Sequence, residues 1–217
     1  MTVRASTEPI SETAALDVYR DDGPLARALG AALGDAIRLS PIALLAVGVL
    51  PLLTLIALEG GDASNGAAGL AVAWLVLAGG ISSGRPHAGR LRWAAIPILR
   101  LGEYAGLLWL AALAGGAGPA AAFALLAALA FRHYDLVYRQ RYQGILPRRG
   151  VGDLAGGWEG RLLAGWVLLA TGALPAGFFV LAATLGALFV GESVASWTRT
   201  AGRQPVSAYE DEEVSEE

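Results

Sequence analysis

The chain has 217 residues, of which 55% are hydrophobic and only 16% are charged, and its formal net charge is −3. Soluble domains carry about 25% charged residues, so this composition excludes a soluble enzyme and a disordered chain and favours an integral membrane protein. The chain contains no cysteine. That excludes disulfide scaffolds, cysteine-ligated zinc and thiol catalysis.

The first 21 residues are polar and of mixed charge. They lack the apolar stretch of a secretory signal, so we expect a mature N-terminus in the cytoplasm. Asp22-Gly23-Pro24 then predicts a helix start, with Asp or Gly as the cap and Pro in the first turn. Apolar residues recur at every fourth position after it: Leu25, Leu29, Leu33 and Ile37. Residues 22–38 are therefore predicted to form an amphipathic helix at the membrane surface.

The rest of the chain up to residue 199 predicts an all-α membrane domain. Six apolar segments follow one another, at 39–58, 66–83, 91–114, 118–138, 160–174 and 176–197. A helix needs roughly 20 residues to cross the hydrocarbon core, with about 17 as the lower end, so the fifth segment is short. The string GALPAG at 172–177 is either a tight hairpin between two spans or a break within one helix.

Arginines alternate between the predicted loops. The loops at 59–66 and 113–119 and the GALP turn contain none, whereas the loops at 82–92 and 139–161 and the C-terminal tail all contain Arg. Because cytoplasmic loops are enriched in basic residues, this pattern predicts six spans with both termini in the cytoplasm of a bacterial plasma membrane. We expect the acidic tail at 200–217 to be disordered.

Charged residues inside the predicted spans are the candidates for function, because a charge within the membrane is costly and usually faces the bundle interior. The candidate ligand-binding residues are Arg100, Glu103, Arg132, His133, Asp135, Arg139, Glu159, Arg161 and Glu192. Since Arg binds phosphate oxygens bidentately, they predict one cytoplasm-facing pocket for an anionic lipid head group or a nucleotide-linked alcohol. The alternative is a set of local ion pairs, helped by arginines that extend to the interface. We also expect Asp135 to pair with Arg132, Arg139 or a basic residue of a neighbouring span.

The string GGWEGR at 156–161 has two interpretations. Its glycines permit a turn and Trp158 anchors at the membrane interface, or the turn leads into a helix N-terminus that faces an anion. The spacing of a phosphate-binding P-loop is absent. No zinc-protease motif and no basic face with interleaved aromatics is present, so we expect no metal, no cofactor and no nucleic acid, and we assign no catalytic residue.

Five strings, DDGPLAR, LRLGEY, AFRHYDLVYR, GGWEGR and GESVASW, resemble a family of actinobacterial membrane domains of unknown function. The resemblance covers about residues 20–199. In that family the domain occurs alone or fused behind a nucleotidyltransferase and a CDP-alcohol phosphatidyltransferase domain. No activity is established that the resemblance could carry over to this chain.

A weaker resemblance is to the CDP-alcohol phosphatidyltransferases themselves, six-span proteins with the signature D-x2-D-G-x2-A-R-x8-G-x3-D-x3-D. Residues 22–27 match its DGxxAR part. The remaining signature positions do not match and are Tyr19, Ala36, Ser40 and Leu44. An alternative alignment of LRLGEYAGL with the third span of the inositol-phosphate-type enzymes also lacks the metal-binding aspartates, since their positions are Leu99 and Ala95. The resemblance implies a relative that has lost its two-metal site.

Three functions remain open. The first, which we favour, is a non-catalytic bundle that binds anionic lipid or partners an enzyme of phospholipid or inositol-lipid synthesis. The second is an active lipid head-group enzyme, which would need Mg²⁺, and the third is a small transporter. The expected partners are membrane lipids, a CDP-alcohol phosphatidyltransferase-type enzyme or a second copy of the chain.

Overall fold

The computed structural model describes residues 18–86, 90–143 and 149–201, and throughout these ranges the structure is helical, without strands. The helices are α2 (Pro24–Leu33), α3 (Pro41–Glu59), α4 (Asn65–Ser83), α5 (Ala95–Ala114), α6 (Gly118–Gln143), α7 (Arg149–Leu154), α8 (Gly157–Ala170) and α9 (Leu174–Ala201). Two short 3-10 turns, Gly60–Asp62 and Arg92–Ala94, extend α3 and α5. The first two residues of the predicted tail at 200–217 belong to α9, and the rest of the tail and most of the N-terminal segment lie outside the described residues.

Five of these helices are long and apolar enough to cross a membrane: α3, α4, α5, α6 and α9. The fifth predicted span, 160–174, corresponds to α8, which has only 14 residues. At 1.5 Å per residue α8 is about 21 Å long, whereas the hydrocarbon core is about 30 Å thick. Within the described residues five helices are therefore long enough to cross a membrane, and α8, at the place of the predicted fifth span, is shorter.

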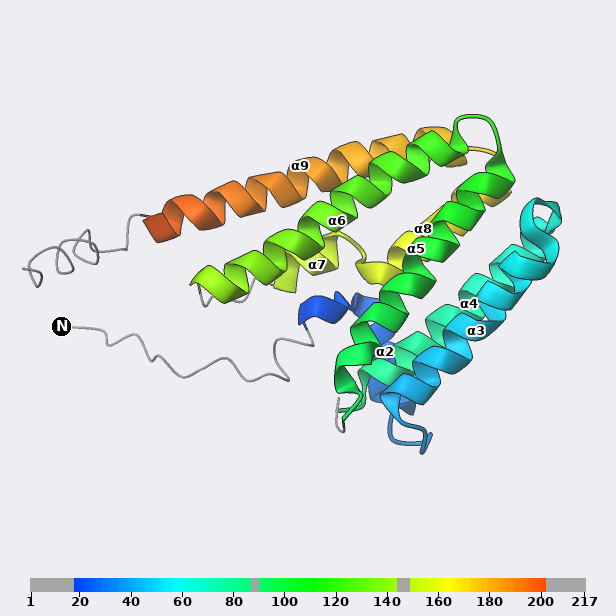
Figure 1. Cartoon of the computed structure of the whole chain (residues 1–217), viewed down its shortest axis with the longest axis horizontal. Helices are drawn as coiled ribbons and strands as arrows, with labels where there is room; N and C mark the ends of the chain where they lie inside the picture. The colour runs from blue at the N-terminus through cyan, green and yellow to red at the C-terminus, as the bar shows by residue number, and fades with distance from the viewer. Residues whose placement is uncertain (1–17, 87–89, 144–148, 202–217) are drawn as a thin grey trace, which may run out of the picture.

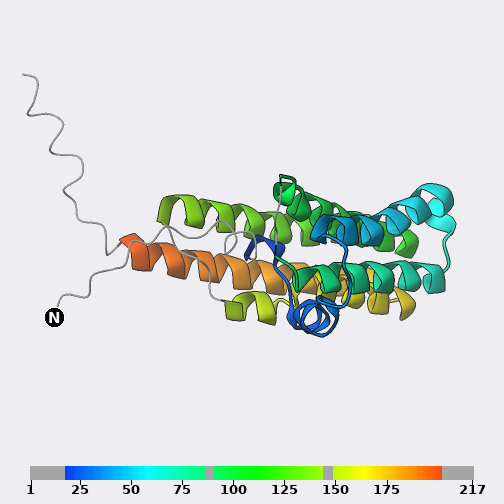
Figure 2. The same ribbon diagram turned by 90° about the horizontal axis from the view of Figure 1, so that it is seen from below.

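The helices run up and down in sequence order (Figures 1 and 2). α3, α4, α5 and α8 pack against one another, and α6 forms a long pair with α9. The connections at 60–64, 115–117 and 171–173 lie at one end of the bundle, on the right of Figure 1. These are the three predicted loops without Arg, and they lie together at one end of the bundle.

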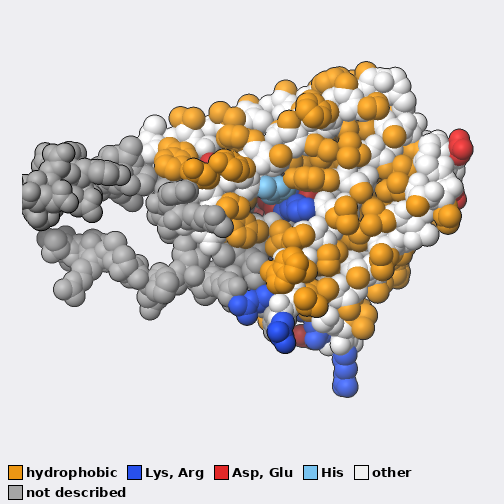
Figure 3. Space-filling view, viewed as in Figure 1, with side chains coloured by type: hydrophobic (Ala, Val, Ile, Leu, Met, Phe, Trp, Pro, Cys, Tyr) orange, Lys and Arg blue, Asp and Glu red, His pale blue; other side chains and the backbone are white. Residues whose placement is uncertain are grey.

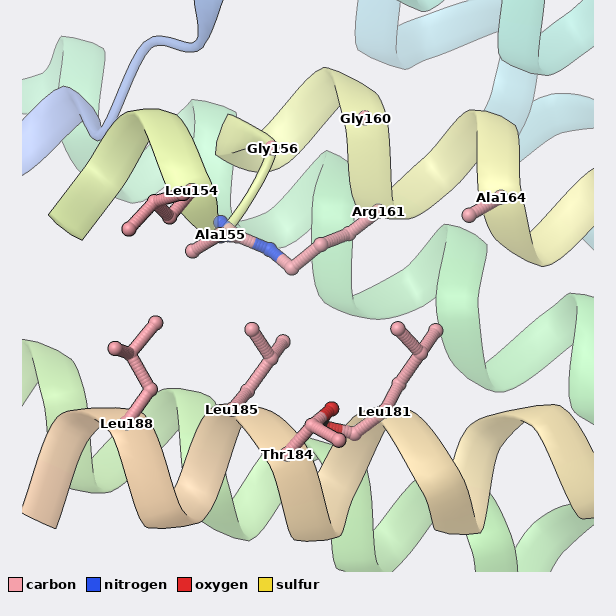
Figure 4. A pocket seen from close by; sticks show the side chains of 10 residues that line it. All are labelled: Leu154, Ala155, Gly156, Gly160, Arg161, Ala164, Leu181, Thr184, Leu185 and Leu188. Carbon is pink, nitrogen blue, oxygen red and sulfur yellow. Dashed lines mark hydrogen bonds between the residues drawn. The ribbon is translucent and has the colours of Figure 1, made fainter. Parts of the chain in front are cut away.

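The GALPAG string forms a tight hairpin between two helices. α8 ends at Ala170 and α9 begins at Leu174. Between them Gly172 has a φ of +72°, a conformation that glycine adopts without steric cost. Gly177 then lets the start of α9 approach Leu168 of α8 closely. The two helices consequently run antiparallel, as Figure 4 shows.

Glycines on α4 receive the two tryptophans of α8. A Cβ atom at Gly79 would lie 2.6 Å from the Trp158 ring, and a Cβ atom at Gly69 would overlap the indole of Trp166. Membrane helices approach each other through such small residues, because lipid tails supply no hydrophobic drive for association. Trp158 is fully buried by this contact. The interpretation of Trp158 as an interface anchor is therefore wrong.

Helix α2 begins as predicted, with Gly23 as N-cap and Pro24 in the first turn, but it ends at Leu33 rather than at residue 38. Beyond its end, Arg85 Nη1 donates to the carbonyl oxygens of Gly34 and Ile37, so these two groups have side-chain donors instead of helical ones. α2 packs across the ends of α4 and α8 and is seen end-on in Figure 2, where the long helices lie in the plane.

Candidate functional site

Glu103 is the centre of a first cluster of buried charges. Its side chain is fully buried on α5. Glu103 Oε1 accepts a hydrogen bond from Arg161 Nε of α8 at 2.7 Å, and Oε2 pairs with Arg100 one turn earlier on α5. Arg161 Nη2 also lies 2.9 Å from a carboxylate oxygen of Asp21. Three separate segments of the chain therefore meet at this point.

The third of these segments, residues 19–22, belongs to the part of the chain that the sequence places in the cytoplasm. Arg100 Nη2 donates to the carbonyl oxygens of Tyr19 and Arg20 at 2.6 and 2.8 Å. The indole N–H of Trp158 donates to Asp22 at 2.8 Å, and Arg20 pairs with Asp22 at 2.7 Å. Arg20 is 1% exposed. The segment is therefore part of the bundle, and its charges are neutralised there.

We call this cluster the α5–α8 network. Its members are Arg20, Asp21, Asp22, Arg100, Glu103 and Arg161. Sequence reasoning found Arg100, Glu103 and Arg161 and missed the other three. One signal was available, because two arginines beside a single buried glutamate require a further carboxylate for neutrality.

A second cluster joins α6 and α9, and we call it the α6–α9 network. Its ionic members are Arg132, Asp135, Arg139 and Glu192. Asp135 lies 2.7 Å from Arg139, which confirms the predicted pairing, and it also accepts a hydrogen bond from Ser193 at 2.7 Å. Glu192 pairs with Arg132 and lies 3.3 Å from Arg139. Each carboxylate in this network is thus neutralised by arginine.

His133 links the two parts of the bundle. Its Nδ1 lies 2.7 Å from the hydroxyl of Tyr104 on α5, while the preceding residue, Arg132, faces Phe189 of α9 with its guanidinium 5.1 Å from the ring centroid. On the face seen in Figure 3, mostly apolar side chains surround a small group of Arg, His and acidic side chains. A polar interior therefore lies behind an apolar exterior at this face.

Glu159 lies apart from both networks. Its two carboxylate oxygens accept hydrogen bonds from the backbone N–H groups of Gly23 and Ala26, at 3.1 and 3.0 Å. These are donors that the first turn of a helix leaves unsatisfied, so Glu159 caps α2 from a distant part of the chain. The nine predicted residues thus divide between two networks, the Tyr104–His133 link and one helix cap. The single point of convergence that the sequence suggested is not the observed arrangement.

The turn before α8 requires its two glycines. Gly156 and Gly157 have φ values of +74° and +63°. A Cβ atom on Gly157 would also overlap the backbone of Gly23. Both interpretations of GGWEGR contain this turn, and the backbone geometry confirms it.

A groove of about 350 Å³ separates α8 from α9 (Figure 4). Its lining is mainly apolar and consists of Leu154, Ala155, Gly156, Gly160, Arg161, Ala164, Leu181, Thr184, Leu185 and Leu188. Arg161 is the one charged residue among them, and its side chain extends along the wall toward Ala155. Of the nine predicted site residues, Arg161 is the one that lines this groove.

A metal ion would need several His, Asp or Glu side chains close together. Within the described ranges no group of three His, Asp or Glu side chains is placed to hold a metal ion. Each network also balances its own charges, with three arginines facing three carboxylates in the first and two facing two in the second. These arrangements can hold helices together without any further ion.

The chain belongs to the family of unknown function DUF5941, which matches residues 11–214. This match confirms the resemblance to a domain of unknown function. No curated protein and no solved structure matches the chain.

Proposed function

We propose that this chain is a non-catalytic membrane bundle that partners an enzyme of phospholipid or inositol-lipid synthesis. The observation that carries the non-catalytic part is the pairing of the carboxylates inside the spans. Glu103 contacts two arginines, Glu192 contacts two, and Asp135 contacts one arginine and a serine hydroxyl. An enzyme that uses divalent metals needs carboxylate oxygens that converge on a shared cation.

Placement in the plasma membrane with both termini in the cytoplasm is part of this proposal. It is supported by the large apolar side chains on the outer surface, such as Leu50, Leu58, Leu70 and Val180, which are 60–79% exposed. It is also supported by the three Arg-free connections at one end of the bundle. Reporter fusions after Asn65 and Gly115 should report the outside, and fusions after Arg149 and at the C-terminus should report the cytoplasm. A C-terminal fusion that reports the outside would contradict this topology.

The partner is suggested by the resemblance, because the related domains occur fused to CDP-alcohol phosphatidyltransferase domains. The experiment is to purify the tagged chain from native membranes under mild detergent and to assay the eluate for transfer from CDP-diacylglycerol to an alcohol in the presence of Mg²⁺. We expect activity enriched over a different tagged multi-span protein, and no activity from the chain purified alone after recombinant expression.

The absence of catalysis and the partnership with an enzyme are tested by different outcomes. Turnover by the recombinant chain alone, lost in Glu103→Gln or Asp135→Asn, would establish an enzyme. Absence of transferase activity from the native eluate would remove the proposed partner and leave the non-catalytic bundle.

A further inference from the structure

Two connections between helices meet at one end of the bundle. The segment 34–40 joins α2 to α3, and the segment 84–94 joins α4 to α5. Arg85 of the second segment donates hydrogen bonds to the carbonyl oxygens of Gly34 and Ile37 in the first. Because α3 and α5 both end at Arg-free connections, they begin at the opposite end of the bundle, and the two segments lie there together.

These two segments carry an excess of positive charge. Together they contain four arginines and a single acidic residue, Asp35. Figure 3 shows several Arg side chains along the lower edge of the molecule, where α3 and α5 begin in Figure 1. The connection at the far end of α3 has Asp62 instead and no basic residue. Positive charge is therefore concentrated at the end where α3 and α5 begin.

The arginines of this surface are accessible, whereas those of the two networks are buried or part-buried. Arg38 and Arg90 are both exposed. Neither forms an ion pair with another residue in the part of the chain that the structure describes. Their guanidinium groups can therefore bind an anion from outside the chain through charge-assisted hydrogen bonds.

Apolar side chains lie among these arginines. Trp93 and Leu91 are 64% and 60% exposed, and Leu39, directly after Arg38, is 46% exposed. In residues 90–93 basic and apolar side chains alternate, and all four are exposed. We call this surface the basic rim. Its members are Arg38, Leu39, Arg90, Leu91, Arg92 and Trp93.

In the proposed membrane placement, the basic rim lies at the level of the lipid head groups. Two of the helices that are long enough to cross a membrane start beside it, at Pro41 and at Arg92. Trp is enriched at this level because its ring is apolar and its N–H is polar, and basic side chains next to a span attract anionic lipids. The basic rim combines both kinds of side chain.

From these features together, we infer that the basic rim binds the head groups of anionic phospholipids, with phosphates at Arg38 and Arg90 and with Trp93 at the boundary of the acyl chains. An acidic polypeptide would neutralise the arginines but would leave Trp93 and Leu91 in water, whereas a lipid leaflet surrounds both kinds of side chain. A zwitterionic head group is less suitable, because its ammonium group would approach the same arginines.

This inference rests on the proposed function only for the placement of the chain in a membrane, and it adds a lipid preference that a partner enzyme does not require. Loss of lipid binding with transferase activity still enriched in the native eluate would remove the lipid site alone. The reverse result would remove the partner alone.

The exposed arginines offer matched variants. The double variant Arg38→Gln with Arg90→Gln removes both charges, and the double variant Arg38→Lys with Arg90→Lys keeps them at the same positions. Arg199→Gln is the control outside the basic rim, because Arg199 is exposed near the end of α9, on the same side of the membrane in the proposed topology. Exposed substitutions of this kind change stability little, and the thermal midpoint without lipid checks that each variant is folded.

The test titrates the detergent-purified full chain with phosphatidylglycerol and, separately, with phosphatidylethanolamine, and counts bound lipids by native mass spectrometry. We expect tighter binding of phosphatidylglycerol. The Gln double variant should bind it about tenfold more weakly or worse, because each arginine near an anionic lipid contributes about fivefold. The Lys double variant and Arg199→Gln should bind as the parent chain does, and raised ammonium acetate should weaken the binding.

Several outcomes would overturn the inference. Equal binding of the two lipids would remove the preference for anionic head groups, and unchanged phosphatidylglycerol binding by the Gln double variant would remove the basic rim as the site. An equal loss in Arg199→Gln would mean that total charge decides the binding rather than these positions.

Two further arms identify the occupant. Inorganic phosphate at the concentration of the lipid should not displace phosphatidylglycerol, and displacement would assign the basic rim to a free anion. Removal of residues 206–217, which contain the acidic tail, should leave lipid binding unchanged. Binding of lipid only after this removal would assign the basic rim to the tail of the chain itself.

Discussion

The two charge networks neutralise buried acids in different ways. In the α6–α9 network, Arg139 and Asp135 are four residues apart on one helix, and Glu192 adds a contact from the neighbouring helix. In the α5–α8 network, Arg100 lies three residues before Glu103 on α5, but Arg161 joins Glu103 to Asp21 from a distant helix, and the N-terminal segment supplies half of the charged residues. Acidic and basic residues three or four positions apart on a helix can therefore form a local ion pair alone, or they can also bind a distant segment of the chain.

The networks also differ in how deeply the carboxylate shared by two arginines is buried. Arg139 and Arg161 each contact two carboxylates, whereas Arg132 and Arg100 each contact one. The shared carboxylates differ in burial, because the Glu103 side chain is fully buried and that of Glu192 is 12% exposed. We therefore expect the α5–α8 network to be the more sensitive to single substitutions.

The largest expected effect is that of Glu103→Ala. It leaves the buried Arg161 and the part-buried Arg100 without their shared carboxylate, and breaking a buried pair in this way costs about 3–5 kcal/mol. The yield of monodisperse protein and the thermal midpoint in detergent should both fall strongly. Asp62→Ala, at an exposed acid beside α4, is the control and should behave as the parent chain. Equal stability of Glu103→Ala and the control would mean that the network does not hold α5 to α8.

Asp21→Asn tests whether the N-terminal segment is a structural part of the bundle. The amide cannot neutralise Arg161, so we expect a loss of about 2 kcal/mol, within the range for removing one partner of a buried polar pair. Limited proteolysis near residue 20 should accelerate together with the fall in thermal midpoint. A variant as resistant as the parent chain would show that this segment contributes nothing to stability, and the contrast between the networks would be lost.

Asp135→Asn should cost less than either of these substitutions, about 1–2 kcal/mol. Arg139 retains Glu192, and the asparagine side chain still accepts the hydrogen bond from Ser193. The comparison with Glu103→Gln, measured by thermal unfolding in the same detergent, is direct because both changes replace a carboxylate by an amide. A larger loss for Asp135→Asn than for Glu103→Gln would reverse the ranking of the two networks.

Arg27→Ala should have the smallest effect. Arg27 pairs with Asp153 at 2.6 Å, but both side chains are more than 40% exposed, and exposed pairs contribute about 0–1 kcal/mol. The thermal midpoint should change little, and raised salt should remove whatever difference remains. A loss as large as that of Asp21→Asn would show that the tie between α2 and α7 matters as much as the buried contacts.

Several features followed from the sequence alone. The apolar segments identified every long helix, because a run of apolar residues of membrane length has few other stable environments. The Asp22-Gly23-Pro24 signal located the start of α2, since Pro has no N–H to satisfy in the first turn. The i, i+4 spacing identified the Asp135–Arg139 pair, because those positions share one helix face.

Other features were decided by tertiary structure. The length of α8, the burial of Trp158 against Gly79 and the cap that Glu159 provides for α2 all depend on which helices become neighbours. The same holds for Arg20, Asp21 and Asp22, whose polar character predicts exposure to water. Composition and spacing predict only the interactions that form within one segment of the chain. A charged segment enters the interior only when distant partners neutralise it, and the folded arrangement of helices is what brings Arg100, Trp158 and Arg161 to that segment.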